Sequence, residues 1–249
     1  MKNICRVSMS TVAPLFDESH HHTGNAVDLA MHSLFKADAV CFDVDSTVVS
    51  EEGIDVLAEY LGKGDAVAAL TRQAMEGGMA FQEALSARLE LLQPSKQSIL
   101  KCLQDQPLVL TDGVQELMEA LQRKKVDIWL VSGGFRIMIE PIAHKLEIPV
   151  ENIVANTLLF SGDGSYTGFD ATEPTSADMG KPKALAKIQA AKGYQTMVMV
   201  GDGATDAQAK PPAAAFIGFG GIVERAAVKA KADWFVTDFR DMTKIVEQR

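Results

Sequence analysis

The chain has 249 residues, of which 47% are hydrophobic and 23% are charged. These proportions are typical of a globular protein with a sizeable core, and they exclude disorder over most of the length. The 33 acidic residues outnumber the 24 lysines and arginines, which gives a formal net charge of −9. Because such a charge repels phosphate backbones, nucleic acid is not an expected partner. No apolar run is long enough to span a bilayer, so a membrane is not expected as a partner either.

Residues 1–35 are interpreted as an N-terminal extension followed by a leading helix that begins near Val27. Residues 1–16 contain Lys2 and Arg6 but no acid, a composition that weakly resembles an organelle transit peptide; a disordered extension explains it equally well. The three cysteines of the chain have no CxxC spacing, which predicts neither a disulfide framework nor a zinc site. We therefore expect a reducing compartment, the cytoplasm, with import into an organelle as the alternative.

The predicted elements begin with residues 37–44, a short apolar run that ends in acids and is typical of a buried strand. Residues 53–106 instead repeat apolar side chains at helical spacing, with breaks at 62–64 and 93–95, where Ser95 is an expected helix N-cap. Beyond these helices, strands and helices alternate. Strands are predicted at 126–131, 153–160, 165–169, 196–200, 213–217 and 234–236, helices at 135–146 and 182–191, and a hairpin turn at 161–164.

This order of elements predicts an α/β fold. The expected core is a Rossmann-like, mostly parallel sheet with helices on both faces, formed by residues 36–52 and 107–249. A helical-bundle cap, residues 53–106, is inserted after the first strand. In open α/β sheets ligands bind beyond the carboxyl ends of the strands, so we expect the chemistry of the protein at those ends.

Carboxylates gather where two of the predicted strands end. Asp43 and Asp45 follow the first strand, and Asp202 and Asp206 follow the strand at 196–200. Two carboxylates at the end of a buried strand are unfavourable unless a cation neutralises them. The four acids together make a hard oxygen site suited to Mg²⁺.

Groups that suit a phosphate follow the other strand ends. Ser132 is followed by Gly133 and Gly134, which offer a hydroxyl and bare backbone N–H groups at a helix N-terminus. Lys181 adds a mobile positive charge for the same phosphate. Each of these features alone is common in turns or on surfaces. Their placement at successive strand ends predicts phosphoryl transfer, because that reaction depends mainly on positioning and charge stabilisation.

Four motifs resemble those of the haloacid-dehalogenase superfamily phosphatases. They are FDVDST at 42–47, SGGFR at 132–136, Lys181 and GDGATD at 201–206. More narrowly, residues 37–234 resemble the phosphoserine phosphatase family, through EEGID at 51–55, QPS at 93–95 and FIGFGG at 216–221. The superfamily motifs are highly specific for the type of reaction, whereas the narrower likeness depends on the helical insert.

The resemblance implies Mg²⁺-dependent hydrolysis of O-phospho-L-serine to L-serine and phosphate, the last step of serine biosynthesis, through an aspartyl-phosphate intermediate. Asp43 would be the nucleophile, and Asp45 would protonate the leaving oxygen and then activate water. The ligands of Mg²⁺ would be Asp43, the backbone carbonyl of Asp45 and Asp202, with Asp206 in support. Thr205 would help to orient Asp206 or a water bound to the phosphate.

One arginine of the cap stands out on physical grounds. Arg88 falls between Leu85 and Leu92, near the centre of the apolar stripe of a predicted helix. That position favours a face that closes over an anion, with an arginine at the edge of the stripe or paired with an internal acid as the alternative. The Arg88 guanidinium suits a carboxylate and the Glu52 carboxylate suits an ammonium group. Together they describe a zwitterion that carries a phosphate.

The family resemblance assigns the same two roles to Glu52 and Arg88. It also places Met75 and Phe81 against the apolar side of the substrate, although Met75 is equally well interpreted as part of the cap core. Glu76 stands where relatives often have a glycine, so an extra carboxylate is expected near the pocket.

Three other functions fit parts of the same pattern. A phosphatase of the same fold could act on another small phosphorylated amine. A receiver-type signalling domain also has an aspartate, a hydroxyl residue and a lysine on a parallel sheet, but it needs no helical insert. A dinucleotide site at Gly218 and Gly220 lacks its third glycine, because Val223 occupies that position. A homodimer is a possible assembly.

Overall fold

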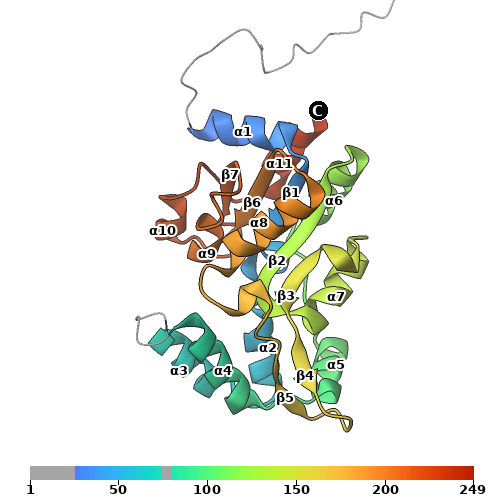
Figure 1. Cartoon of the computed structure of the whole chain (residues 1–249), viewed down its shortest axis with the longest axis vertical. Coiled ribbons are helices and arrows are strands. Elements are labelled where there is room, and N and C mark those ends of the chain that lie inside the picture. The colour runs from blue at the N-terminus through green and yellow to red at the C-terminus, as the bar shows by residue number, and fades with distance from the viewer. Residues whose placement is uncertain (1–25, 75–79) are drawn as a thin grey trace, which may run out of the picture.

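The computed structural model of the chain describes residues 26–74 and 80–249. Their main sheet has six parallel strands in the order β3-β2-β1-β6-β7-β8 (Figure 1). The strands are β1 (Ala39–Phe42), β2 (Asp127–Phe135), β3 (Ile153–Asn156), β6 (Met197–Gly201), β7 (Ala215–Phe219) and β8 (Trp234–Val236). The predicted α/β fold is confirmed. Because β1 pairs with both β2 and β6, the carboxyl ends of these three strands are neighbours.

Helices cover both faces of the sheet, and alternate strand side chains face the two layers. Val40 and Phe42 of β1 belong to one apolar cluster, whereas Ala39 and Cys41 belong to another. The first cluster packs against α1 (Ala26–Lys36), α6 (Val114–Arg123), α7 (Arg136–Lys145) and α11 (Phe239–Glu247), and the second against α8 (Gly180–Lys192), α9 (Ala204–Ala207) and α10 (Ala226–Lys229). Leu34 of α1 is buried in the first cluster, so this helix packs with the core.

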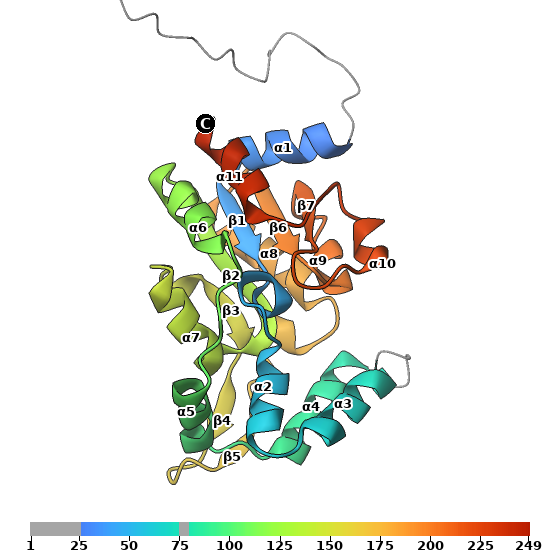
Figure 2. The same cartoon turned by 180° about the vertical axis from the view of Figure 1, so that it is seen from behind.

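A group of helices between β1 and β2 lies at the end of the molecule remote from the C-terminus (Figures 1 and 2). Its described part consists of α2 (Gly53–Tyr60), α3 (Gly64–Gln73), α4 (Phe81–Leu92) and α5 (Lys96–Asp105). Leu57, Leu89 and Ile99 of three of these helices are buried in one apolar cluster. The Ser95 hydroxyl accepts the Ser98 N–H at 3.0 Å, so the expected N-cap of α5 is confirmed.

The prediction of one strand over residues 153–160 is wrong. The segment divides at Thr157 into β3 of the main sheet and β4 (Leu158–Phe160), which pairs with β5 (Tyr166–Phe169) in a separate antiparallel hairpin. The division has a physical reason, because Leu158 leaves the core and is buried in the cluster that α4 and α5 also share. The polar pair Asn156 and Thr157 stands at the division, but a segment that is apolar on both sides of it does not reveal which of two apolar clusters each half joins.

Several expectations concern parts of the chain outside the described residues, namely the transit-like composition of residues 1–16, Cys5, Met75 and Glu76. Within the described residues, Cys41 and Cys102 are buried free thiols. None of the helices in the described ranges is both long and apolar enough to cross a membrane.

Candidate active site

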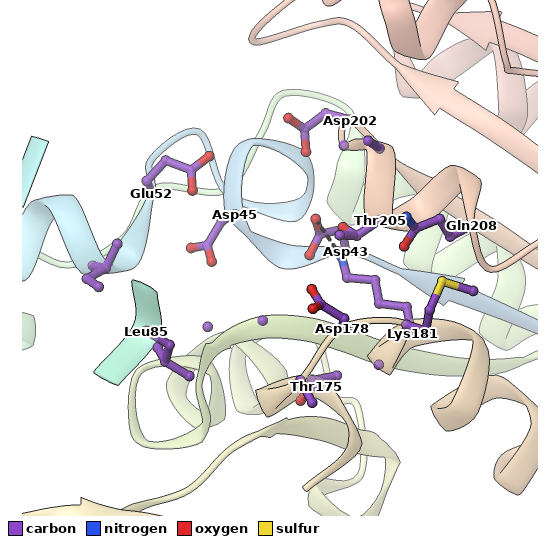
Figure 3. A pocket seen from close by; sticks show the side chains of 18 of the residues that line it. Asp43, Asp45, Glu52, Leu85, Thr175, Asp178, Lys181, Asp202, Thr205 and Gln208 are labelled. Atoms are coloured by element: carbon purple, nitrogen blue, oxygen red, sulfur yellow. Dashed lines mark ion pairs between the residues drawn. The ribbon is translucent and has the colours of Figure 1, made fainter. Parts of the chain in front are cut away.

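A cleft of about 590 Å³ lies beyond the ends of β1, β2 and β6, with α2 and α4 of the helical insert on its other side (Figure 3). The residues predicted from the strand ends meet here, although they come from distant parts of the chain. The cleft is lined by Asp43, Asp45, Glu52, Arg88, Gly133, Lys181, Asp202 and Thr205. Asp206 and Ser132 lie just behind its wall and are fully buried.

The turn after β1 positions both of its carboxylates. Residues Val44–Val48 form a wide turn, closed by a hydrogen bond from the Val49 N–H to the Val44 carbonyl at 3.0 Å, with Asp45 and Ser46 in non-helical conformations. The Val44 N–H donates to Asp43 Oδ1 at 2.7 Å, and the Gly53 N–H donates to Asp45 Oδ1 at 2.8 Å. The two side chains are therefore oriented by backbone donors, and both face the cleft (Figure 3).

Lys181 is the central cation of the cleft. Its Nζ lies 2.8 Å from Asp43 Oδ2 and 2.5 Å from Asp206 Oδ1, and its side chain is only 7% exposed. Burial lowers the pKa of Lys181, but the carboxylates of Asp206 and Asp43 outweigh burial and raise this pKa above its ordinary value. The lysine therefore stays charged at any physiological pH.

Three carboxylates gather tightly enough to share a cation. Asp43, Asp202 and Asp206 each offer an oxygen atom, and these atoms lie within 4.8 Å of one another. Burial and then the charge of Asp43 raise the pKa of Asp202 to about 6, and the same two causes raise the pKa of Asp206. Carboxylates crowded in this way repel one another, and a hard divalent cation with oxygen ligands relieves the repulsion. The donor set therefore fits such a cation.

Asp45 differs from these carboxylates in its surroundings. Burial, followed by the charges of Glu52 and Asp43, raises the pKa of Asp45 to about 8. At neutral pH the side chain therefore holds a proton that it can give to a neighbouring atom. Within one turn, Asp43 is thus paired with Lys181 whereas Asp45 keeps its proton, an arrangement that suits a nucleophile beside an acid.

The end of β2 forms a tight glycine turn beside these carboxylates. The Gly134 N–H donates to Ser132 Oγ at 2.8 Å, which leaves the hydroxyl hydrogen free to donate elsewhere. A Cβ on Gly134 would lie 2.8 Å from Asp45 Oδ2 and 3.1 Å from Ser132 Oγ. A side chain at this position would therefore displace both groups, so the close approach requires glycine.

The side of the cleft that belongs to the helical insert carries the two groups expected to recognise a zwitterion. Arg88 of α4 is half-buried, and its Nε donates to the Ala84 carbonyl at 3.0 Å. Burial lowers the pKa of Arg88, while the nearby carboxylates of Asp55 and Glu52 raise it. Glu52 Oε1 accepts the Ser46 hydroxyl at 2.7 Å. Both side chains are thus preoriented at the wall of one cleft.

Arg225 is a residue of the cleft that the sequence motifs missed. It follows β7, and its NH2 lies 2.9 Å from Asp202 Oδ2 and 3.9 Å from Glu52 Oε1. The arginine thus connects the carboxylate cluster of the core with Glu52. Arg225 could have been predicted from its position in the loop beyond a parallel strand, because the other residues of the cleft were predicted from the same kind of position.

For the remaining predicted residues in the described ranges, the structure gives a position but no hydrogen bond to the groups above. Thr205 is exposed at the start of α9, on the cleft wall (Figure 3). Phe81 begins α4, and Met75 lies outside the described residues. Gly218 and Gly220, considered above for a dinucleotide, instead pack against Phe235, whose ring atoms would lie 2.9 and 2.3 Å from a Cβ at these positions.

Comparisons with known proteins agree with this geometry. The family model of haloacid dehalogenase-like hydrolases matches residues 37–210. The phosphoserine phosphatase of Bos taurus is 49% identical over 88% of this chain and 97% of its own length. A solved phospho-aspartyl intermediate analogue of phosphoserine phosphatase superposes with a TM-score of 0.71 at 30% identity, over 84% of this chain and 98% of that one. DsGPDH of Dunaliella salina gives 0.77 at 35% identity, over 86% of this chain and 37% of that longer one. The chain belongs to the haloacid dehalogenase-like hydrolases and, within them, to the phosphoserine phosphatase family.

Proposed function

We propose that the protein hydrolyses O-phospho-L-serine to L-serine and phosphate, the last step of serine biosynthesis. The observation that carries this proposal is the pairing of two half-sites in one cleft. Asp43, Asp45 and Lys181 on the core suit a phosphoryl group, while Glu52 and Arg88 on the opposite wall suit an ammonium group and a carboxylate. The names of the relatives at nearly half identity point to the same substrate.

The proposed cofactor is Mg²⁺. Asp43, Asp202 and the backbone carbonyl of Asp45 would hold it, with Asp206 in support, and the clustering of the three carboxylate oxygens supports this assignment. When bound, the cation supplies positive charge that offsets the negative charge of the phosphoryl group and helps to align it with Asp43.

In the proposed reaction the Asp43 carboxylate forms a bond to phosphorus while the bond from phosphorus to the serine oxygen breaks. Asp45 gives its proton to that oxygen, in keeping with its raised pKa of about 8. The ionised Asp45 then accepts a proton from a water molecule whose oxygen bonds to phosphorus. The bond between phosphorus and Asp43 breaks, phosphate leaves, and Asp43 and Asp45 return to their starting states.

Binding of the two ends of the substrate is assigned to different parts of the cleft. Ser132, Gly133 and Lys181 hold the phosphate oxygens, and Thr205 helps to orient Asp206 or a phosphate-bound water. On the side of the insert, Glu52 binds the ammonium group and Arg88 the carboxylate, with Met75 and Phe81 against the apolar side. Residues 53–106 act as a cap that closes over the site and excludes water in the first step.

Phosphate release from phosphoserine, phosphothreonine and an aryl phosphate, each with Mg²⁺ and with a chelator, tests the proposed function. We expect phosphoserine to have the highest kcat/KM, the chelator to abolish turnover, and Asp43→Asn to be inactive on every substrate. Turnover of the aryl phosphate without turnover of phosphoserine would show a phosphatase of the same fold whose substrate is not phosphoserine. In that case the panel extends to other small phosphorylated amines, the second candidate.

The assembly and the location of the protein are two further proposals. A homodimer is proposed, and sedimentation of the purified protein tests it. A cytoplasmic location is proposed because the cysteines are odd in number and have no CxxC spacing, with organelle import as the alternative suggested by the composition of residues 1–16. Fluorescent fusions with and without residues 1–25 distinguish the two locations.

A further inference from the structure

A buried asparagine at the edge of the sheet connects two parts of the cleft. Asn156 is the last residue of β3 and is 0% exposed. Its Nδ2 donates to the Gly133 carbonyl at 2.7 Å and, at a longer 3.4 Å, to the Thr175 carbonyl. Its Oδ1 accepts the Thr175 hydroxyl at 3.2 Å. Every polar atom of this amide is thus engaged with Gly133 or Thr175, and Asn156 itself does not line the cleft.

The contact with Gly133 fixes the orientation of one peptide group. The carbonyl of Gly133 and the N–H of Gly134 belong to the same peptide, and that N–H donates to Ser132 Oγ at 2.8 Å. Asn156 therefore holds one end of the peptide and Ser132 the other. A peptide between two glycines rotates with little steric resistance. Without Asn156 this peptide can turn over and release Ser132, which lies directly behind the cleft wall beside Gly133.

The contact with Thr175 reaches the second phosphate-binding group. Thr175 is buried in the short turn before α8, and this turn packs directly on Gly180. A Cβ on Gly180 would lie 2.3 Å from the Pro174 carbonyl oxygen and 2.8 Å from Thr175 Cα. Because Gly180 immediately precedes Lys181, the position of Thr175 determines where the lysine enters the cleft.

We propose that Asn156 is a positioning residue that holds the Ser132–Gly134 turn and Lys181 in the relative arrangement needed to bind a phosphoryl group. The inference rests on the proposed function only in that a phosphate ester is bound at this end of the cleft. It does not depend on serine, because Asn156 is connected with the phosphate side of the cleft and not with Glu52 or Arg88.

The chain contains a matched control on the same edge of the sheet. Asn152, just before β3, is also buried, and its Nδ2 donates to the carbonyl of Ile128 in β2 at 2.9 Å. Asn152 and Asn156 thus make the same kind of contact with the same strand, at its opposite ends. Truncating either removes a buried hydrogen bond to a β2 carbonyl, and Asn156→Ala also loses the contacts with Thr175, so activities are compared at equal fractions of folded protein.

The test compares Asn156→Ala with Asn152→Ala on phosphoserine and on an aryl phosphate, together with inhibition by inorganic phosphate. For Asn156→Ala we expect kcat/KM to fall about 10²-fold on both substrates, the scale of a displacement of about 1 Å in a reacting group. We also expect phosphate to inhibit it about 10-fold more weakly. Asn152→Ala should keep both values within about twofold of the parent, although it also loses a buried hydrogen bond and its melting temperature falls.

Equal losses of activity in the two variants, at equal fractions of folded protein, would overturn the proposal, as would unchanged inhibition of Asn156→Ala by phosphate. Should Asn156→Ala not fold, Thr175→Val removes the hydroxyl contact alone and should weaken phosphate inhibition, whereas Thr175→Ser should restore it. A parent protein that hydrolyses only the aryl phosphate would contradict the proposed substrate, yet the effect of Asn156 would still be measured on that ester.

Discussion

Replacing Arg88 by alanine separates recognition of the amino acid from recognition of the phosphate. Arg88 lines the cleft from α4, and its Nε is held by the Ala84 carbonyl, which directs the two terminal nitrogens elsewhere. A carboxylate in the cleft then receives two charge-assisted hydrogen bonds from one fork. An aryl phosphate has no such carboxylate. The substitution is therefore expected to affect the two substrates very differently.

The size of the effect follows from the contacts that are lost. Hydrogen bonds to charged groups contribute about 1.5–3 kcal/mol, so a half-buried fork on a carboxylate is worth about 3 kcal/mol. At 1.4 kcal/mol per factor of ten, kcat/KM for phosphoserine should fall about 10²-fold, mainly through KM. For the aryl phosphate the change should stay within about threefold, because Lys181 and the glycine turn are untouched.

Steady-state kinetics on both substrates measures this difference directly. The matched control is Arg72→Ala on the neighbouring helix α3, where the side chain is exposed and does not line the cleft. This control should leave both substrates at the parent values. Equal losses on both substrates in Arg88→Ala would refute the assignment and indicate that Arg88 only supports the fold of the insert.

Three further predictions concern the carboxylates and the glycine turn. Mg²⁺ should raise the melting temperature of chelator-treated protein by several degrees, as its binding is linked to the folded state, and Asp202→Asn should remove this shift in scanning calorimetry. The pKa of Asp45 is about 8 in the folded protein and about 4 in the unfolded chain. The stability that its proton contributes is therefore fully present below pH 4 and is lost progressively as the pH rises from 4 to 8. Asp45→Asn should therefore lower kcat at least about 10²-fold, yet stabilise the metal-free protein by up to about 5 kcal/mol at pH 8 and by almost nothing near pH 4 in denaturant titrations. Gly134→Ala, whose Cβ would crowd Asp45 and Ser132, should reduce kcat strongly while changing the melting temperature little.

Much of the site was predictable because the parallel sheet brings together residues that are distant in sequence. Asp43, Lys181 and Asp202 each lie at the end of a strand or helix that the spacing of apolar residues locates. Because ligands bind beyond strand ends, these residues are then expected in one site. Ser95 was equally predictable, since its capping contact is local.

Other features depend on three-dimensional packing that no local pattern contains. Arg225 pairs with Asp202 from the loop after β7, in which Gly220 packs closely against Phe235. Asn156 closes an apolar run and has no motif of its own, so its contact with Gly133 required the register of β2 and β3. The same segment concealed the division between β3 and β4, because the residues on both sides of Asn156 and Thr157 are apolar.

The covalent state of Asp43 during turnover is the most direct test of the central claim. Acid quenching in the presence of phosphoserine and Mg²⁺, followed by mass spectrometry of the peptide that contains Asp43, measures it. We predict that this aspartate carries phosphate in the parent protein, and that Asp43→Asn shows neither the modification nor turnover. Full turnover without phosphate on Asp43, or an active Asp43→Asn variant, would contradict the account.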